Sequence, residues 1–323
     1  MKFTKRTVLA LAAGALATSA FCSASHAADL DQIRMGYIAD YYGASLAAIA
    51  TEQDLWAKHG LEAKLSVFTN GPIQVQALRA GSLDFAYIGS GALWLPASGQ
   101  AKVIAVNALG YSDRVIAQPG IDSIADLKGK KVGIPEGTSG DMLTRLALEA
   151  AGMTLDDVEV VYMDPATIVT AFSSGQIDAA GLWYPFVDII KKRVPDLNEL
   201  KKNEDFLPEI AFPSSFIVSD DMAENMEVIR KVNAVLKEAG DFRRENTEEA
   251  VGITASFLNV PKGPLLTESA LAMQPSSEEL VEMTKEGHVD QWFDTLAGLY
   301  ADFGKIENPL PASEFYLGAL YAE

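Results

Sequence analysis

Short apolar runs alternate with stretches of helical spacing along the first third of the chain. The runs predict strands at 33–37, 63–68, 85–88 and 103–109, and the stretches between them predict helices at 43–59 and 72–80. Gly60 and Gly81 follow the two helices, where a glycine commonly ends a helix. Strands that alternate with helices form a mostly parallel sheet with helices on its faces, so this region predicts an α/β lobe.

The same order begins again after residue 113. Strands are predicted at 114–118, 131–134, 158–162 and 179–182, and helices at 123–127, 140–151 and 165–174. After residue 219 the chain becomes charged and helical, with helices predicted at 223–246, 248–257, 277–286 and 290–303. We expect these last helices to pack on the first lobe. No long flexible linker separates the two units.

These patterns predict two similar lobes, one of them discontinuous in sequence. Lobe 1 is expected to comprise residues 28–112 and 220–323, and lobe 2 residues 113–219. We expect the chain to cross between the lobes near 111–114 and again near 214–219.

The first 27 residues have the pattern of a secretory signal peptide. A basic start with Lys2, Lys5 and Arg6 precedes the apolar run 7–21, and small residues precede a predicted cleavage after Ala27. The alternative is a membrane anchor, but the run is shorter than the about 20 residues that a spanning helix needs. The sequence therefore predicts export to the periplasm.

Composition narrows the classes of function. The chain of 323 residues carries a net charge of −18, and loss of residues 1–27 would remove three positive charges and bring it to −21. This acid excess argues against binding to nucleic acid or to an anionic membrane surface. The single cysteine, Cys22, lies within the predicted signal peptide, so the mature chain has no thiol for nucleophilic or metal chemistry.

Small and hydroxyl-bearing residues follow several predicted strands. In open α/β sheets, ligands bind beyond the carboxyl ends of the strands. Backbone N–H groups at the start of a helix can hold an anion there without lysine or arginine. The candidate ligand-binding residues are Asp40, Tyr41, Tyr42, Asn70, Gly89, Ser90, Tyr111, Thr138, Ser139, Trp183, Tyr184 and Ser214. For the glycine, serine and threonine turns, plain helix capping is the alternative.

Asp40 and the aromatic candidates have specific expected roles. Asp40 is the acidic candidate for a ligand amine, or else an N-cap of the helix that follows. Trp183 and Tyr184 either line an apolar wall of the site or belong to the core, and with Tyr41 and Tyr42 they could partly enclose a cation. We expect the net negative charge to lie on the solvated exterior, while amides and hydroxyls form the site.

Motifs of catalysis are absent from the sequence. It contains no GxSxG, HExxH, GxxxxGK[ST] or GxGxxG pattern. His59 and His288 have no neighbours at metal-ligand spacing, so no metal site and no cofactor are expected. The sequence thus predicts a binding protein rather than an enzyme.

Several motifs together support a family resemblance that covers nearly the whole mature chain. They are Gly36-Tyr37, the segment ALRAGSLDF at 77–85, Gly89-Ser90-Gly91, DLKGKKVGI at 126–134, GQIDA at 175–179 and Trp183-Tyr184-Pro185. On these residues the chain resembles periplasmic solute-binding proteins of the nitrate/sulfonate/taurine ABC-importer family, and most of all the members that bind taurine and alkanesulfonates.

The resemblance implies a two-lobed type II binding protein that closes on its ligand. It also implies that hydroxyls and amides near Gly89, Ser90, Thr138 and Ser139 cradle a sulfonate. One departure concerns the segment after Phe212 and Pro213. The similar taurine binder has an aspartate there for the ligand amine, whereas this chain has Ser214-Ser215. Either Asp40 replaces that carboxylate or the ligand is not taurine.

The leading hypothesis is therefore non-enzymatic. A periplasmic monomer captures a small organic anion, namely an organosulfonate, and delivers it to an inner-membrane ABC permease with its ATPase. One alternative is a binder of a thiamine-precursor pyrimidine or another small heterocycle. A pyrimidine synthase on the same fold is disfavoured because the mature chain has no cysteine. A sensor or structural protein is the remaining class.

Overall fold

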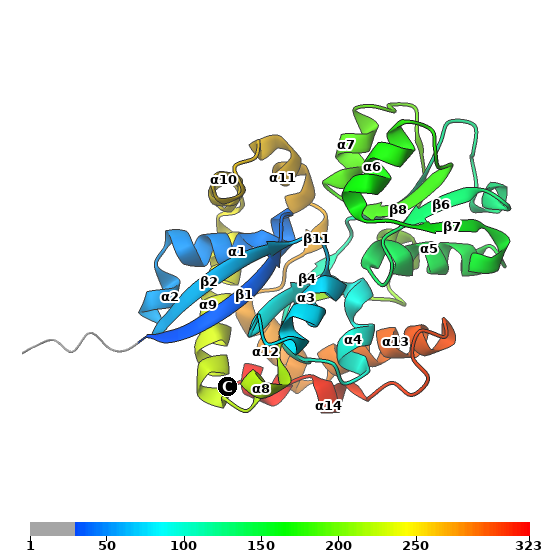
Figure 1. The fold of residues 1–323 in the computed structure, drawn as a ribbon. Helices are drawn as coiled ribbons and strands as arrows, with labels where there is room; N and C mark the ends of the chain where they lie inside the picture. Colours follow the sequence, from blue (N-terminus) through cyan, green and yellow to red (C-terminus); the bar gives the residue numbers. More distant parts are fainter. Residues whose placement is uncertain (1–29) are drawn as a thin grey trace, which may run out of the picture.

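A computed structural model describes residues 30–323. The predicted signal peptide at 1–27 lies outside the described residues. Two sheets, each flanked by helices, form two lobes that lie side by side (Figure 1). We call the unit around the six-stranded sheet the first lobe and the unit around the five-stranded sheet the second lobe. This arrangement confirms the predicted two-lobed α/β fold.

The first lobe contains a mixed sheet in the order β11-β4-β10-β3-β1-β2. Its strands are β1 Asp31–Ile38, β2 Leu61–Phe68, β3 Phe85–Ile88, β4 Lys102–Gly110, β10 Pro213–Val218 and β11 Ala272–Met273. β1 pairs in parallel with β2 and β3, whereas β10 runs antiparallel between β3 and β4.

The second lobe contains a sheet in the order β7-β6-β8-β5-β9. Its strands are β5 Asp113–Ala117, β6 Lys131–Ile134, β7 Glu159–Tyr162, β8 Ala179–Trp183 and β9 Asn198–Lys202. β6 pairs in parallel with β7 and β8, and β5 runs antiparallel to β8 and β9. The carboxyl ends of β6 and β8 and the start of β5 consequently lie at one edge of this sheet.

Fifteen α-helices accompany the strands of the described chain. They are α1 Tyr41–Glu52, α2 Leu55–Lys58, α3 Gly71–Arg79, α4 Trp94–Ala97, α5 Ser139–Ala150, α6 Pro165–Ser173, α7 Phe186–Lys191, α8 Asp220–Ala223, α9 Met226–Glu245, α10 Thr247–Leu258, α11 Lys262–Ser269, α12 Ser277–Lys285, α13 His288–Asp302, α14 Ala312–Phe315 and α15 Gly318–Tyr321. As expected, the helices after β10 pack on the first lobe, where α9 contacts α1 and β4.

Two differences from the predicted elements have physical reasons. The single helix expected at 43–59 is broken between α1 and α2, where Asp54 has a left-handed φ of 54°. The crossing expected at 214–219 is instead β10, whose apolar side chains are buried in the middle of the first lobe's sheet. β10 lies within the range 113–219 expected for lobe 2, yet it pairs in the other sheet. The sequence analysis also missed α11.

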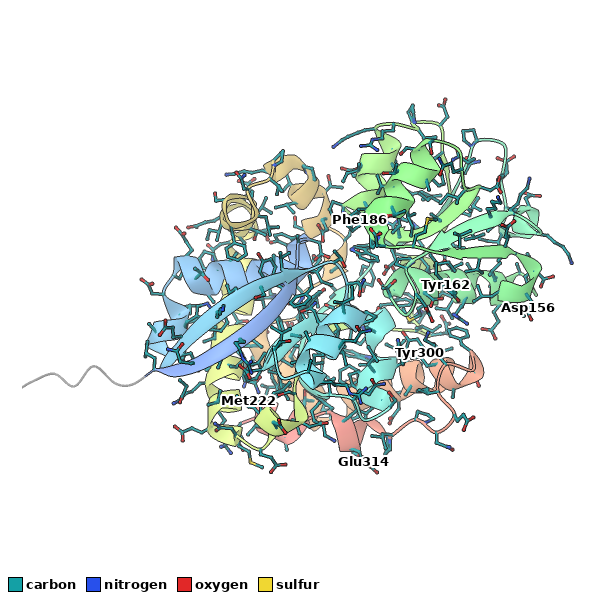
Figure 2. The ribbon with its side chains drawn as sticks, viewed as in Figure 1. Asp156, Tyr162, Phe186, Met222, Tyr300 and Glu314 are labelled. Carbon is teal, nitrogen blue, oxygen red and sulfur yellow. The ribbon has the colours of Figure 1, made fainter. Side chains whose placement is uncertain are left out.

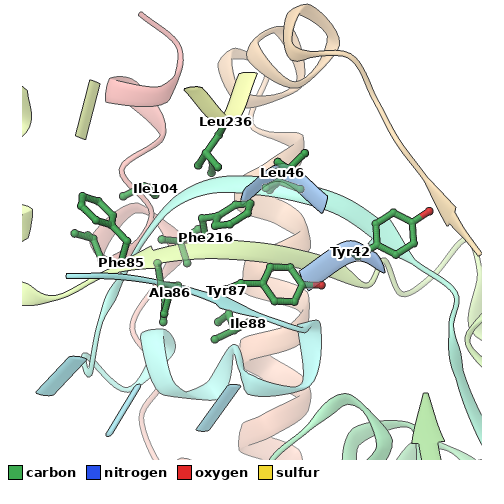
Figure 3. Close-up of a cluster of buried hydrophobic side chains, with 14 of the residues drawn as sticks. Tyr42, Leu46, Phe85, Ala86, Tyr87, Ile88, Ile104, Phe216 and Leu236 are labelled. Carbon is green, nitrogen blue, oxygen red and sulfur yellow. The ribbon is translucent and has the colours of Figure 1, made fainter. Parts of the chain in front are cut away.

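The first lobe has one continuous apolar core between its sheet and helices. Figure 3 shows part of it, with Phe85, Ile104 and Phe216 packed together. Tyr42 and Tyr87 lie at the end of this cluster, and in the view their hydroxyls point out of it on the same side. The core therefore supports these two rings rigidly where they leave it.

One side of the molecule joins the two lobes through α13 and α5. The Tyr300 hydroxyl donates to the Ser90 carbonyl at 3.0 Å and lies 3.1 Å from the sulfur of Met142 in α5. Figure 2 places Tyr300 where α13 approaches the second lobe. The Trp94 indole donates to the Gly137 carbonyl at 3.2 Å, and Lys305 pairs with Glu136 at 3.0 Å. These contacts fix one side of the boundary between the lobes.

Candidate functional site

A cleft of about 600 Å³, its open mouth included, lies between the two lobes. Both lobes line it, and nine of the twelve candidate residues are among its walls. They are Asp40, Tyr42, Asn70, Gly89, Ser90 and Ser214 from the first lobe and Thr138, Ser139 and Trp183 from the second. The carboxyl ends of strands from separate sheets thus meet at one place, as expected for a ligand site in an open α/β fold.

Asp40 caps α1 and also lines the cleft. Its Oδ1 accepts a hydrogen bond from the Gly43 backbone N–H at 2.6 Å, which caps α1, and its carboxyl also lines the cleft. The residue is only 5% exposed. Burial raises the pKa of Asp40 to about 7, although hydrogen bonds from Gly43 and from the Trp183 side chain oppose the rise.

Glu268 brings a second carboxyl to the same end of α1. Its Oε1 accepts a hydrogen bond from the Tyr41 backbone N–H at 2.9 Å, and its Oε2 is buried without a hydrogen-bond partner among residues 30–323. Burial, and then the nearby charge of Asp40, raise the pKa of Glu268 well above its usual range. The sequence analysis missed this residue because its helix, α11, comes from the far C-terminal part of the chain and was itself not predicted.

A third carboxyl, Asp113, lines the cleft from the start of β5. It is 4% exposed, and its Oδ1 has no hydrogen-bond partner in the described part of the chain. Burial raises the pKa of Asp113 to about 6, although the nearby polar side chains of Ser139 and Asn203 oppose the rise. Asp113 was not among the predicted site residues, because it directly precedes the predicted strand 114–118 and has no local signal of ligand binding.

The beginning of α5 supplies the neutral polar part of the cleft. Thr138 precedes the helix and Ser139 begins it, so both lie beside the backbone N–H groups of the first turn. The Thr138 hydroxyl donates to the Pro135 carbonyl at 2.6 Å, which fixes its orientation. Ser90 and Gly89 face this turn from the first lobe. The backbone N–H groups of this first turn and the hydroxyls of Ser139 and Ser90 can donate hydrogen bonds to an oxygen-rich ligand.

Four aromatic side chains complete the walls: Tyr42, Tyr87, Trp183 and Phe212. The Tyr42 hydroxyl donates to the Ser269 carbonyl at 2.7 Å, and the buried Arg243 guanidinium lies 5.2 Å from the centre of the Tyr42 ring. Tyr87 and Phe212 were not among the predicted site residues. Tyr87 lies within the predicted strand 85–88, and Phe212 directly precedes Pro213. Neither position has a local sequence pattern that indicates ligand binding.

Three candidates do not line the cleft. Tyr41 is fully buried beneath Tyr42, and it contributes its backbone N–H to Glu268 rather than its ring to the site. The Tyr184 hydroxyl instead accepts a hydrogen bond from Lys191 at 2.8 Å on the far side of the strand end. Tyr111 lies at the crossing, where its backbone N–H donates to the Leu271 carbonyl at 2.8 Å.

The cleft is more acidic than expected, because Asp40 was the one carboxyl among the predicted site residues. Three of its lining residues in the described chain are Asp or Glu, and none is Lys or Arg.

Within residues 30–323, no group of three or more His, Cys, Asp or Glu side chains is arranged to hold a metal ion. No helix in this range has the length and apolar character to cross a membrane.

The paired lobes and the cleft between them define the class of two-lobed, type II solute-binding proteins. The NMT1/THI5-like family model matches residues 45–250 of this chain. A Brucella abortus protein named only as a binding protein is 58% identical over 291 residues, which span 90% of this chain and 91% of the relative. The chain therefore belongs to the NMT1/THI5-like family.

More distant relatives agree with this class. An Escherichia coli protein named for binding aliphatic sulfonates is 28% identical over 265 residues, which span 79% of this chain and 81% of the relative. The crystal structure of the periplasmic aliphatic sulphonate binding protein of Escherichia coli has a TM-score of 0.68 at 22% identity, covering 91% of this chain and 99% of that structure. These relatives are binding proteins and not enzymes.

Proposed function

We propose that this protein is the periplasmic substrate-binding component of an ABC importer. The observation that carries the proposal is a cleft whose walls come from both lobes, with Ser90 on one side and Ser139 on the other. A ligand bound there would draw the lobes together, lose its water and gain hydrogen bonds from both sides. An inner-membrane permease with its ATPase would then accept the closed, monomeric complex. The predicted signal peptide at 1–27 supports a periplasmic location.

For the ligand, we propose a small organosulfonate. The first turn of α5, which begins at Ser139, offers the N–H and hydroxyl donors that a sulfonate requires, and Ser90 adds a hydroxyl from the other lobe. The relative named for binding aliphatic sulfonates supports the same class. A small nitrogen heterocycle is the second candidate, because Tyr42, Tyr87 and Trp183 could pack against its ring.

Titration calorimetry with a panel of small solutes tests this proposal. The panel contains taurine, plain alkanesulfonates, sulfate, nitrate and an aminopyrimidine, and small-angle scattering with each solute reports whether the lobes close. We expect saturable binding of a sulfonate with a smaller radius of gyration. If only the pyrimidine binds, the ligand is a heterocycle and the proposal of a sulfonate ligand is wrong. If no small solute binds and deletion of the gene leaves uptake of all of them unchanged, the importer role is wrong.

A further inference from the structure

Two buried carboxyls, Asp40 and Glu268, meet at the start of α1 and face the cleft together. Both residues are at most 5% exposed, and the charge of Asp40 raises the pKa of Glu268 beyond the effect of burial. Gly43 and Tyr41 donate backbone hydrogen bonds to one oxygen of each. The remaining oxygen of Glu268, Oε2, is buried and has no partner within the described residues. A buried acceptor of this kind costs free energy until a donor reaches it.

Arg243, a buried cation near the Tyr42 ring, forms no ion pair with either carboxyl in the described part of the chain. Arg243 is 1% exposed and donates to neutral acceptors, the Ser45 hydroxyl at 2.9 Å and the Asn107 side-chain oxygen at 2.9 Å. Its guanidinium lies 5.2 Å from the centre of the Tyr42 ring, and Arg243 is not among the residues that line the cleft. A positive charge on the cleft side would favour the ionised form of both carboxyls.

The other titratable groups around the pair do not supply that charge. Asp113 faces Asp40 from the second lobe, and its charge further raises the pKa of Asp40. Tyr41, Tyr42 and Tyr87 are neutral at physiological pH, because burial raises the pKa of each above its usual value. The faces of aromatic rings that border a site also favour a cation.

We propose that Asp40 and Glu268 form a subsite for a protonated amine of the ligand. This inference rests on the proposed function and narrows it: the imported solute carries an ammonium group, or a protonated nitrogen on a ring, at the end that enters the first lobe. For a sulfonate ligand this means an aminoalkanesulfonate, with its anionic end at α5 and its ammonium at α1. A plain alkanesulfonate would leave Glu268 Oε2 without a donor and would bind more weakly.

Matched pairs of ligands test the subsite, because the members of a pair differ only at the nitrogen. One pair is taurine and 2-hydroxyethanesulfonate, and the other is an aminomethyl-pyrimidine and its hydroxymethyl counterpart. We expect the amine to bind at least about tenfold more tightly than the alcohol within the pair that binds, since a charge-assisted hydrogen bond is worth about 1.5–3 kcal/mol. The preferred pair also identifies the class of ligand.

Variants separate recognition from a structural role. Glu268→Gln keeps an oxygen for the Tyr41 N–H but cannot ionise, and Asp40→Asn does the same for Gly43. We expect each to reduce the amine preference about tenfold or more, whereas the exposed Glu249→Gln in α10 leaves it unchanged. Thermal unfolding of each variant confirms that it folds. A merely structural role would change stability without changing the ratio of the two affinities.

A proton count gives an independent readout. Burial raises the pKa of both Glu268 and Asp40, so an ammonium group that favours their ionised forms would release protons on binding, which calorimetry in buffers of different ionisation enthalpy measures. Equal affinity for amine and alcohol overturns the subsite and leaves the importer role intact. If neither pair binds but another solute closes the lobes, the proposed ligand classes fail, and the subsite also fails if that solute carries no positive charge.

Discussion

Gly91 in the first lobe lies so close to Ser139 in the second that a β-carbon at Gly91 would be 2.0 Å from the Ser139 backbone nitrogen. The same β-carbon would be 2.0 Å from the Thr138 carbonyl carbon. Only a residue without a side chain allows this approach. The contact lies beside the turn that begins α5, so it sets how near that turn comes to Ser90.

Gly91→Ala is therefore expected to push the lobes apart at the cleft. Overpacking against backbone costs about 1–3 kcal/mol, which corresponds to about tenfold to hundredfold weaker ligand binding. Calorimetry measures the loss, and small-angle scattering should show a larger radius of gyration. Gly240→Ala in α9 is the control, because no atom lies within 4 Å of its β-carbon position. Unchanged affinity in Gly91→Ala would show that this approach does not control the site.

The buried carboxyls predict that the ligand-free protein loses stability as pH rises. The pKa of Asp40 rises from 3.8 to about 7 on folding and that of Asp113 from 3.8 to about 6. At a pH between the unfolded and the folded pKa, each carboxyl holds a proton in the folded state that it releases in the unfolded state. The free energy of unfolding therefore falls as pH increases through this range. Asp40 alone accounts for a fall on the order of 4 kcal/mol at most, at about 1.4 kcal/mol per pKa unit.

Urea unfolding at about pH 5 and about pH 8 measures this fall. Asp40→Asn should flatten the dependence, because the asparagine does not ionise. An equal or greater stability at the higher pH in the wild type would contradict the assignment of raised pKa values. A saturating amine ligand should reduce the fall, since its charge favours ionised carboxyls.

Arg243 is expected to be essential for the stability of the first lobe. Arg243→Leu would leave the Ser45 hydroxyl and the side-chain and backbone oxygens of Asn107 without their donor in the core. We expect a loss of about 3–5 kcal/mol in denaturant unfolding, as is typical when one partner of a buried charged network is removed. Arg244→Leu is the matched control. Arg244 is exposed and lies 3.9 Å from Glu279, so its loss should cost less than about 1 kcal/mol.

Much of the fold could be predicted because its strands are short apolar runs bounded by glycine or proline. β3 and β6 begin and end at the predicted residues. The antiparallel strand β10 could not be placed from its own sequence. An apolar run such as 213–218 has the same local pattern in a crossing and in the middle of a sheet, and only pairing with β3 and β4 decides between them.

The site could be predicted where it depends on the ends of strands, and not where it depends on distant segments. Asp40, Ser90 and Thr138 each follow a strand, and the fold gathers such positions at one edge. Glu268 comes from a helix that no local pattern connects to α1. Trp183 and Tyr184 are neighbours at the end of β8, where successive side chains point to opposite sides, so only Trp183 faces the cleft.

Trp183 links the second lobe to Asp40, and this contact gives the last prediction. The Trp183 side chain lowers the pKa of Asp40 through a hydrogen bond, and its ring lines the cleft. Trp183→Phe would keep an aromatic surface but remove the indole N–H, so the pKa of Asp40 should rise further and ligand affinity should fall about tenfold. Trp183→Leu should weaken binding more, because it also removes the aromatic face. Calorimetry at several pH values separates the two effects: in Trp183→Phe the affinity should recover as pH increases and Asp40 ionises, whereas in Trp183→Leu it should not. A loss in Trp183→Phe that is the same at every pH would mean that the indole N–H does not act through Asp40.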